Sequence, residues 1–175
     1  MPFEDLDWRR IDVMAIAGNW GLATIDEPQR KSCREWLRRQ GYVIDSLNCT
    51  NGVSAAVTDL GKLLHWEEQF GYTLSPESRN LNALRDGFLE YLVEPPGSDR
   101  VFEMIRPDLL FQEEPEWLTG FLSIAQERCV GELALGHRFF TLLVVPDEKC
   151  TLIGQRIPDL RAVPYPCWDE HSFSI

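Results

Sequence analysis

The chain has 175 residues, enough for one domain with a sizeable core, and its 44% hydrophobic and 11% aromatic content excludes general disorder. Its formal net charge of −11 disfavours direct binding to nucleic acid, which needs a concentrated basic patch. No apolar run approaches the roughly 20 residues of a membrane-spanning helix, and the acidic N-terminus lacks the basic region of a signal peptide. We therefore expect a cytoplasmic globular protein with no membrane contact.

The N-terminal region, residues 1–41, predicts a β-hairpin followed by a helix. Strand-like segments at 11–17 and 20–25 flank a Gly-Asn turn signal, which is typical of a hairpin. A helix follows from Asp26, which is placed to cap it, and Gly41 ends it. We expect this region to extend a sheet formed by the rest of the chain.

The next segment predicts one strand and two helices. Residues 42–47 are strand-like, and the helix after them has Ser54 or Thr58 as its cap and ends at Gly71. A Ser-Pro-Glu sequence at Ser75 favours the start of a second helix, with a cap, a proline and an acid in the first turn. One face of this second helix is apolar: Leu81, Leu84, Phe88 and Leu92.

The second half of the chain contributes two strands around a helix. Residues 100–105 are strand-like, and the Glu-Pro-Glu sequence at 114–116 opens a helix with an inward apolar face. Residues 139–145 are almost wholly apolar, as expected of a strand that is covered on both faces. The tail, 146–175, contains four prolines and is expected to be irregular.

The order of elements from residue 42 onward is strand, helix, helix, strand, helix, strand. Helical crossovers between short strands indicate a parallel sheet, so we predict an α/β fold with a small parallel β-sheet packed with helices. The N-terminal hairpin and helix would extend that sheet. The chain is then one domain: an N-terminal extension at 1–41, a core at 42–145, and a tail at 146–175 packed on the same domain.

The negative charge is concentrated in the middle of the chain. Residues 60–132 hold 14 acids and 6 bases, a net of −8, whereas 1–59 have a net of −2 and 133–175 a net of −1. Solubility alone explains an acidic surface in many proteins. The alternative is that this segment attracts a cationic partner.

One helix edge in this acidic segment is polar. Arg79, Asn82, Asp86 and Glu90 are spaced by 3, 4 and 4 positions and share an edge opposite the apolar stripe. Gly87 costs roughly 1 kcal/mol in a helix interior relative to alanine, which suggests the close approach of a partner or of another element. Both a solvated helix face and a partner-binding surface are consistent with this pattern.

The element order from Tyr42 to Val145, together with the pattern Asn80-Leu81-x-Ala83-Leu84-x-Asp86, resembles the barstar family of intracellular ribonuclease inhibitors. In that family a similar helix and the loop before it plug the cationic active site of a secreted ribonuclease. The resemblance implies a barstar-like fold, no enzymatic activity, no cofactor or metal, and a basic protein partner. The N-terminal hairpin and helix resemble the extension carried by larger barstar-like proteins.

The resemblance assigns roles to three positions. It implies that Asp86 is the principal inhibitory aspartate, whose carboxylate stands in for a substrate phosphate. Asn82 occupies the place of a second contact aspartate and has lost the charge. Tyr91 falls where the family has an aromatic contact residue.

The sequence also departs from the family pattern. The family's Tyr-Tyr-Gly before the helix is replaced by Pro-Glu-Ser at 76–78, and Arg85 stands where an aromatic residue is frequent. Ser123 or Ile124 falls where the family has an acidic contact on a later helix, and Glu127 lies one turn away. These departures bear on the target of the protein more than on its fold.

Other clusters of functional residue types have simpler explanations. His65 and the two acids after Trp66 form no HExxH pattern, and the acids at 113–116 fit a helix N-terminus. The five cysteines are an odd number without a CxxC pair, so we expect reduced thiols in small buried side chains. One predicted helix has a basic face that could bind nucleic acid or anionic lipid, or could pair with acids of the same chain. The interleaved Glu35 favours pairing within the chain. The basic residues of this face are Arg30, Lys31, Arg34, Arg38 and Arg39.

Three hypotheses about function follow. The first is a non-enzymatic, barstar-like inhibitor or immunity protein that occludes the active site of a basic ribonuclease or related toxin. The second is a barstar-fold interaction module whose partner is not a nuclease. The third is a small hydrolase whose site has no recognisable motif.

Overall fold

A computed structural model describes residues 12–13, 15–16, 21–77, 80–91, 98–147, 156–157, 160–161 and 163–164. Its centre is a five-stranded sheet in the order β2-β3-β4-β1-β7, in which every pairing is parallel. The strands of this sheet are β1 (Leu22–Asp26), β2 (Val43–Asn48), β3 (Arg100–Ile105), β4 (Phe139–Val145) and β7 (Val163–Pro164). The predicted α/β class and the parallel sheet are confirmed.

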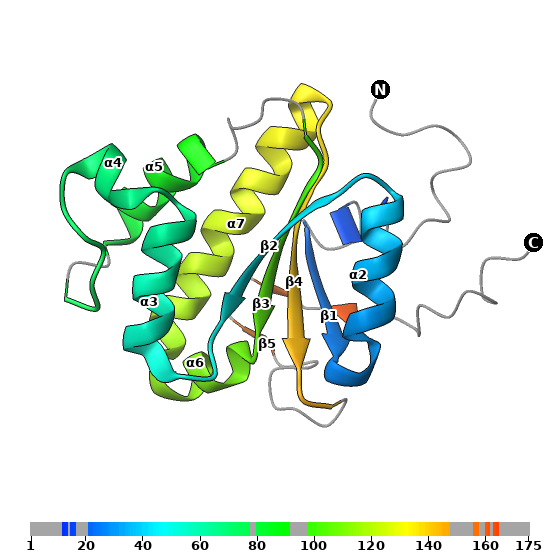
Figure 1. Ribbon diagram of the computed structural model, residues 1–175, viewed down its shortest axis with the longest axis horizontal. Coiled ribbons are helices and arrows are strands. Elements are labelled where there is room, and N and C mark those ends of the chain that lie inside the picture. The colour runs from blue at the N-terminus through cyan, green and yellow to red at the C-terminus, as the bar shows by residue number, and fades with distance from the viewer. Residues whose placement is uncertain are drawn as a thin grey trace, which may run out of the picture.

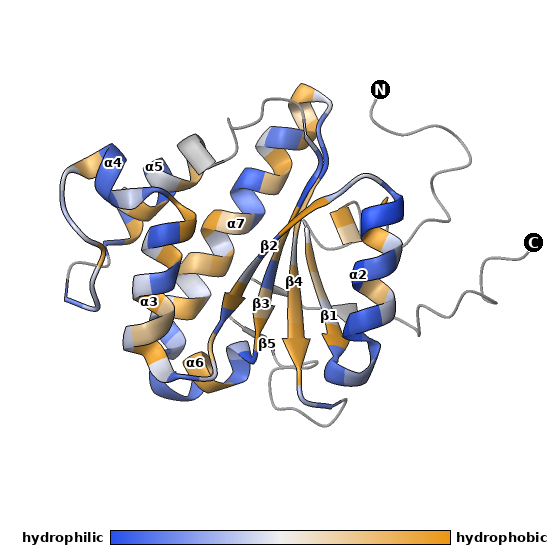
Figure 2. Ribbon diagram, viewed as in Figure 1, coloured by the Kyte–Doolittle hydropathy of each residue, from blue (hydrophilic) through white to orange (hydrophobic). Residues whose placement is uncertain are grey.

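Helices cover both faces of this sheet (Figure 1). A 3-10 turn, η2 (Glu27–Gln29), and helix α2 (Arg30–Arg39) lie on one face. The other helices connect β2 to β3 and β3 to β4: α3 (Gly52–Leu63), α4 (Trp66–Phe70), α5 (Leu81–Tyr91), α6 (Pro107–Glu113) and α7 (Pro115–Leu135). Hydrophobic residues dominate the strands, whereas the helices alternate hydrophilic and hydrophobic stretches (Figure 2).

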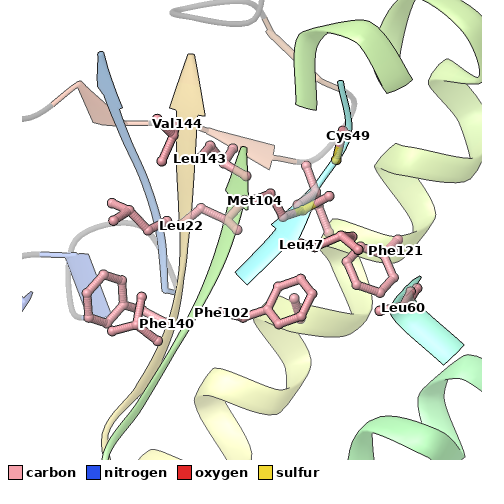
Figure 3. Close-up of a cluster of buried hydrophobic side chains, with 14 of the residues drawn as sticks. Leu22, Leu47, Cys49, Leu60, Phe102, Met104, Phe121, Phe140, Leu143 and Val144 are labelled. Carbon is pink, nitrogen blue, oxygen red and sulfur yellow. The ribbon is translucent and has the colours of Figure 1, made fainter. Parts of the chain in front are cut away.

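The alternation of side chains along β4 divides the core into two layers. Phe139 packs against Phe88 of α5 with ring centroids 6.4 Å apart, whereas the next residue, Phe140, packs against Tyr42 at 5.7 Å. All residues of β4 are buried, which confirms the expectation of a strand covered on both faces. Figure 3 shows part of this core with side chains of both layers, in which Phe102 of β3 packs against Phe121 at a centroid distance of 5.8 Å.

The predicted N-terminal hairpin is wrong. Residues 12–13 and 15–16 are helical, and β1 pairs in parallel with β4 and β7 instead of folding back on a neighbouring strand. Val13, Ala15 and Ile16 are almost completely buried, so the apolar run that suggested a strand belongs to a buried helix. Periodicity cannot separate these two cases in a short apolar run. The extension does add to the sheet, through β1 next to β4.

The helix that follows β1 is placed as predicted. The Asp26 carboxylate accepts the backbone N–H of Gln29 at 3.2 Å, and Gly41 follows the helix with a left-handed φ of 87°.

The segment between β2 and β3 differs from the prediction at three places. The first helix starts at Gly52, not at Ser54 or Thr58, and it breaks at His65, whose φ of 50° is left-handed, so α3 and α4 are separate helices. Helix α5 starts after Asn80, not at Ser75, and the Asn80 side chain accepts the N–H of Asn82 at 2.8 Å. Residues 76–77 instead form a turn.

Helix α6 and three short strands of the tail were not predicted. Helix α6 begins with a proline after Arg106, whose φ is 59°. The tail expected to be irregular contains three short strands, of which β5 (Arg156–Ile157) and β6 (Leu160–Arg161) pair with each other and β7 joins the main sheet. The rest of the tail lies outside the described residues. None of the helices in the described part of the chain is long and apolar enough to cross a membrane.

Three cysteines are free and buried, as predicted: Cys33, Cys49 and Cys129. Cys150 and Cys167 lie outside the described residues. Burial in apolar surroundings raises the pKa of both Cys49 and Cys129 to about 12, and it also raises that of Cys33. These three thiols therefore stay protonated, and unreactive as nucleophiles, at neutral pH.

The buried thiols predict a loss of stability in alkaline solution. An unfolded thiol ionises near pH 9.0, whereas the folded thiols keep their protons, so the unfolded state binds fewer protons above that pH. The contribution of each buried thiol to the free energy of unfolding is fully present below this pH. It falls as the pH rises above it, by up to about 1.4 kcal/mol per pH unit for each thiol. Denaturant unfolding across the alkaline range measures this slope. Cys129→Ala should make the slope shallower, and an unchanged slope in that variant would contradict the assignment.

Candidate partner-binding surface

Helix α5 is anchored by its apolar stripe. Leu84 and Phe88 are completely buried, and the Phe88 ring packs edge-on against Phe102 and Phe121 with centroids 5.7 and 5.2 Å apart. Aromatic pairs in this geometry add to the free energy of burial. Leu92, the last residue of the predicted stripe, lies outside the described residues. The stripe fixes which edge of α5 faces outward.

Two glycines let α5 approach its neighbours closely. A Cβ atom on Gly87 would lie 2.9 Å from Cζ3 of Trp66, and one on Gly120 of α7 would lie 2.5 Å from a methyl carbon of Leu81. Gly87 therefore serves the contact between α5 and α4. Of the two explanations that the sequence left open for this glycine, the approach of another element of the same chain is the correct one.

This contact predicts opposite effects for two glycine substitutions. Gly87→Ala gains helix propensity but overpacks the rigid Trp66 indole, so we expect a net loss of roughly 1–2 kcal/mol in the free energy of unfolding. Gly131→Ala in α7 is the matched control, because a Cβ there meets only a distal Arg128 nitrogen at 4.0 Å. It should stabilise the protein by about 0.5–1 kcal/mol. Denaturant unfolding measures the stability of both variants. If both substitutions stabilised the protein, the close packing at Gly87 would be refuted.

The outward edge of α5 presents Asn82 and Asp86. Both side chains are exposed, and they lie one helical turn apart on the same edge. Among the described residues, Asp86 has no hydrogen-bond or ion-pair partner within the chain. The structure thus brings together two of the five predicted site residues.

The other three predicted site residues are described only in part. Arg79 lies outside the described residues. Glu90 and Tyr91 continue α5 in its backbone, but their side chains lie outside the described part of the chain. Their proposed contacts therefore remain predictions.

An ion pair beside this edge was not foreseen. Arg85 of α5 binds Glu127 of α7 through two contacts, with Nε 2.9 Å from Oε2 and Nη2 3.0 Å from Oε1. Both side chains are 56% exposed, so the pair adds less than about 1 kcal/mol to stability. It does neutralise Glu127, which lies one turn from the position where the barstar family has an acidic contact. The two residues are 42 positions apart, and no local sequence signal could have joined them.

A cluster of aromatic residues on α4 and the following turn borders α5. The Trp66 ring lies 4.3 Å from Phe70 and 5.9 Å from Tyr72, and Tyr72 is 42% exposed. Glu67 and Glu68 on the same short helix are also exposed. Sequence reasoning treated this segment as structural. The buried Trp66 fits that interpretation, but Tyr72 and the two acids give the surface near α5 an exposed aromatic ring and further negative charge.

A pocket of about 350 Å³, lined in part by Trp66, lies between α3, α4 and residues 73–74. Its rim is mixed in charge, because it includes Lys62, His65, Glu67 and Glu68. No group of three or more metal-binding side chains occurs within the described ranges.

Comparisons with known proteins bear only on the fold. No protein-family model matches the chain, and no curated protein matches it. The chain is similar to one chain of a solved structure of Drosophila ORC bound to AT-rich DNA and Cdc6, with a TM-score of 0.54 and 10% identity. The match covers 89% of this chain and 51% of that one, so this chain spans about half the length of its structural neighbour. At this identity the likeness concerns the α/β fold alone.

Proposed function

We propose that this protein is a barstar-like inhibitor that occludes the active site of a basic ribonuclease or related toxin with the outward edge of α5. Asp86 enters the basic site in place of a substrate phosphate, and the surrounding acidic surface speeds association. The observation that carries the proposal is the exposed carboxylate of Asp86, which has no partner among the described residues and lies on a helix packed tightly through Leu84 and Phe88. A preformed surface loses little conformational entropy on binding.

The order of elements supports the finer, barstar-like assignment of the fold. From Val43 to Val145 the chain runs through a strand, three helices, a strand, two helices and a strand, and the three strands are adjacent and parallel. The resemblance describes a strand and helix leading into the contact helix, which is the position of α5. Helix α4 then belongs to the segment that precedes the contact helix, where the family pattern already differs from this sequence.

The proposal is tested by inhibition of secreted basic ribonucleases from the protein's own host. Competitive occlusion raises the KM for RNA without lowering kcat, and the inhibition weakens as salt screens the charges. Inhibition that lowers kcat at unchanged KM would contradict occlusion of the active site. A complete lack of binding to such ribonucleases would refute the ribonuclease target.

Restoring the family's second acidic contact gives a separate prediction. Asn82→Asp adds a carboxylate one turn before Asp86, and we expect roughly tenfold tighter binding to a basic ribonuclease, from one added charge-assisted contact. The substitution lies in the first turn of α5, where an acid also suits the helix dipole, so folding should be unaffected. Binding titrations on both forms measure the gain, and weaker binding by the aspartate form would contradict the assigned position.

One observation favours a second candidate, an interaction module of the same fold whose partner is not a nuclease. The ion pair between Arg85 and Glu127 places a cation on α5 beside Asp86 and neutralises a nearby acid. A partner with mixed charge suits that surface better than a uniformly cationic active site. Such a module would leave ribonuclease activity unchanged and would still co-purify with a polypeptide of its host.

A further inference from the structure

Helix α2 carries a groove on the face of the sheet opposite α5. Phe102 of β3 packs toward α5, and the next residue, Glu103, contacts α2, so the two helices lie on opposite sides. The groove has a volume of about 500 Å³ and is lined by Glu27, Arg30, Lys31, Arg34, Glu35 and Arg38. Four cations against two acids give this lining a formal charge of +2, which the Glu103 carboxylate beneath Arg30 and Arg34 lowers to +1, in a chain whose net charge is −11.

A buried carboxylate holds two of the arginines in place. The Glu103 side chain is completely buried, and Arg30 donates to its two oxygens from Nε and Nη2, each at 3.1 Å. Arg34 donates from Nη1 both to Glu103 and, at 2.8 Å, to the Ser46 hydroxyl. Both guanidinium groups are therefore fixed before any ligand arrives, which lowers the entropic cost of binding.

The charges at this point do not balance. Two guanidinium groups share one carboxylate, which leaves one positive charge in excess, and the two arginine side chains are only 27% and 21% exposed. Among the described residues, the one further acid within 4 Å of Arg30 is Glu27, at 3.9 Å and itself 47% exposed. A partly desolvated excess cation is stabilised by an anion that binds from the open side of the groove.

Several donors remain available at the rim. Arg34 Nε and Nη2 have no contact among the described residues, and Arg30 Nη1 has only the long contact of 3.9 Å with Glu27 there. Lys31 and Arg38 are exposed and have no partner among the described residues. The acids Glu27 and Glu35 lie at the rim, so the groove selects a compact anion rather than a long polyanion.

We propose that this groove binds the phosphate group of a small phosphorylated ligand. Guanidinium forks match the geometry of phosphate oxygens, and a phosphomonoester at neutral pH carries a charge of about −1.5 to −2, which complements the lining. The volume falls in the range of small-molecule sites, roughly 300–1,000 Å³. The site is separate from the α5 edge, and the inference does not depend on the proposed function.

Calorimetric titration with inorganic phosphate and with AMP tests the proposal. We expect saturable binding of both, weakened at least about tenfold in the double variant Lys31→Ala, Arg38→Ala, which removes two charge-assisted contacts. These side chains are exposed, so the variant should fold, and thermal unfolding checks that it does. The double variant Lys62→Ala, Arg85→Ala loses the same charge on other helices and should bind like the parent.

Four outcomes would overturn the proposal. The first is that neither phosphate nor AMP binds saturably at millimolar concentration. The second is that the α2 double variant binds as tightly as the parent, and the third is that the control variant weakens binding equally. The fourth is that succinate binds as tightly as phosphate. The last would show a site for carboxylates. The second and third would show that the anion binds elsewhere or responds only to the net charge of the protein.

Discussion

Replacing Asp86 by alanine is expected to weaken binding to a basic ribonuclease by about 2–5 kcal/mol, or roughly 30-fold to several thousandfold. The carboxylate is exposed in the free protein, and in the proposed complex it would be buried against guanidinium groups. Its removal leaves those cations desolvated and unpaired. Because the side chain has no partner within the described residues, the substitution should change the free energy of unfolding by less than about 0.5 kcal/mol.

Two further variants separate the effect of the direct Asp86 contact on binding from the effect of the protein's overall negative charge. Glu113→Ala removes the same charge from an exposed position on α6, which lies at the opposite end of the helical layer from α4 and α5 (Figure 1). It should reduce the association rate slightly and leave the dissociation rate unchanged. Asp86→Asn keeps the shape of the side chain and removes only its charge, and we expect it to lose most of the binding free energy that Asp86→Ala loses. Equal effects of Asp86→Ala and Glu113→Ala on affinity would show that only net charge matters.

Replacing Glu103 by glutamine is expected to cost about 2–4 kcal/mol of folding free energy. The substitution leaves Arg30 and Arg34 close together without the carboxylate that both contact, in the layer between α2 and the sheet. Their partial exposure lets them turn toward solvent, which keeps the cost below that of a fully buried pair. Denaturant unfolding measures the change.

Glu27→Gln is the matched control for this substitution. Its contact with Arg30 is long, at 3.9 Å, and its side chain is 47% exposed, so we expect a change below about 0.5 kcal/mol. A small effect of Glu103→Gln, similar to that of Glu27→Gln, would show that the buried carboxylate does not hold α2 on the sheet.

Local sequence signals were sufficient where they were strong. The almost wholly apolar segment that forms β4 and the Asp26 cap before Pro28 were both predictable, because each depends on neighbouring residues only. The hairpin prediction failed because a buried helix and a buried strand have similar short apolar runs. Helix α5 starts after Asn80 rather than after Ser75, although both positions carry side chains that can cap a helix. Local propensity cannot choose between two such caps.

The surface around Asp86 was predictable only in part. The helical spacing placed Asn82 and Asp86 on one edge, opposite the buried Leu84 and Phe88. The neighbours of that edge come from distant parts of the chain. The pairing of Arg85 with an acid on α7 depends on how the helices pack, and so does the contact of Gly87 with α4. The same limit applies to the α2 groove, because the carboxylate that holds its two arginines in place belongs to β3.

Hydrogen exchange on a complex with a basic ribonuclease from the same host tests the central claim most directly. The experiment compares amide protection in the free and bound protein along the whole chain. We predict that protection increases across α5 and the adjoining α4 segment, while α2 on the opposite face of the sheet is unchanged. Protection that increases on α2 and leaves residues 80–91 unchanged would contradict the assignment of the α5 edge as the partner-binding surface.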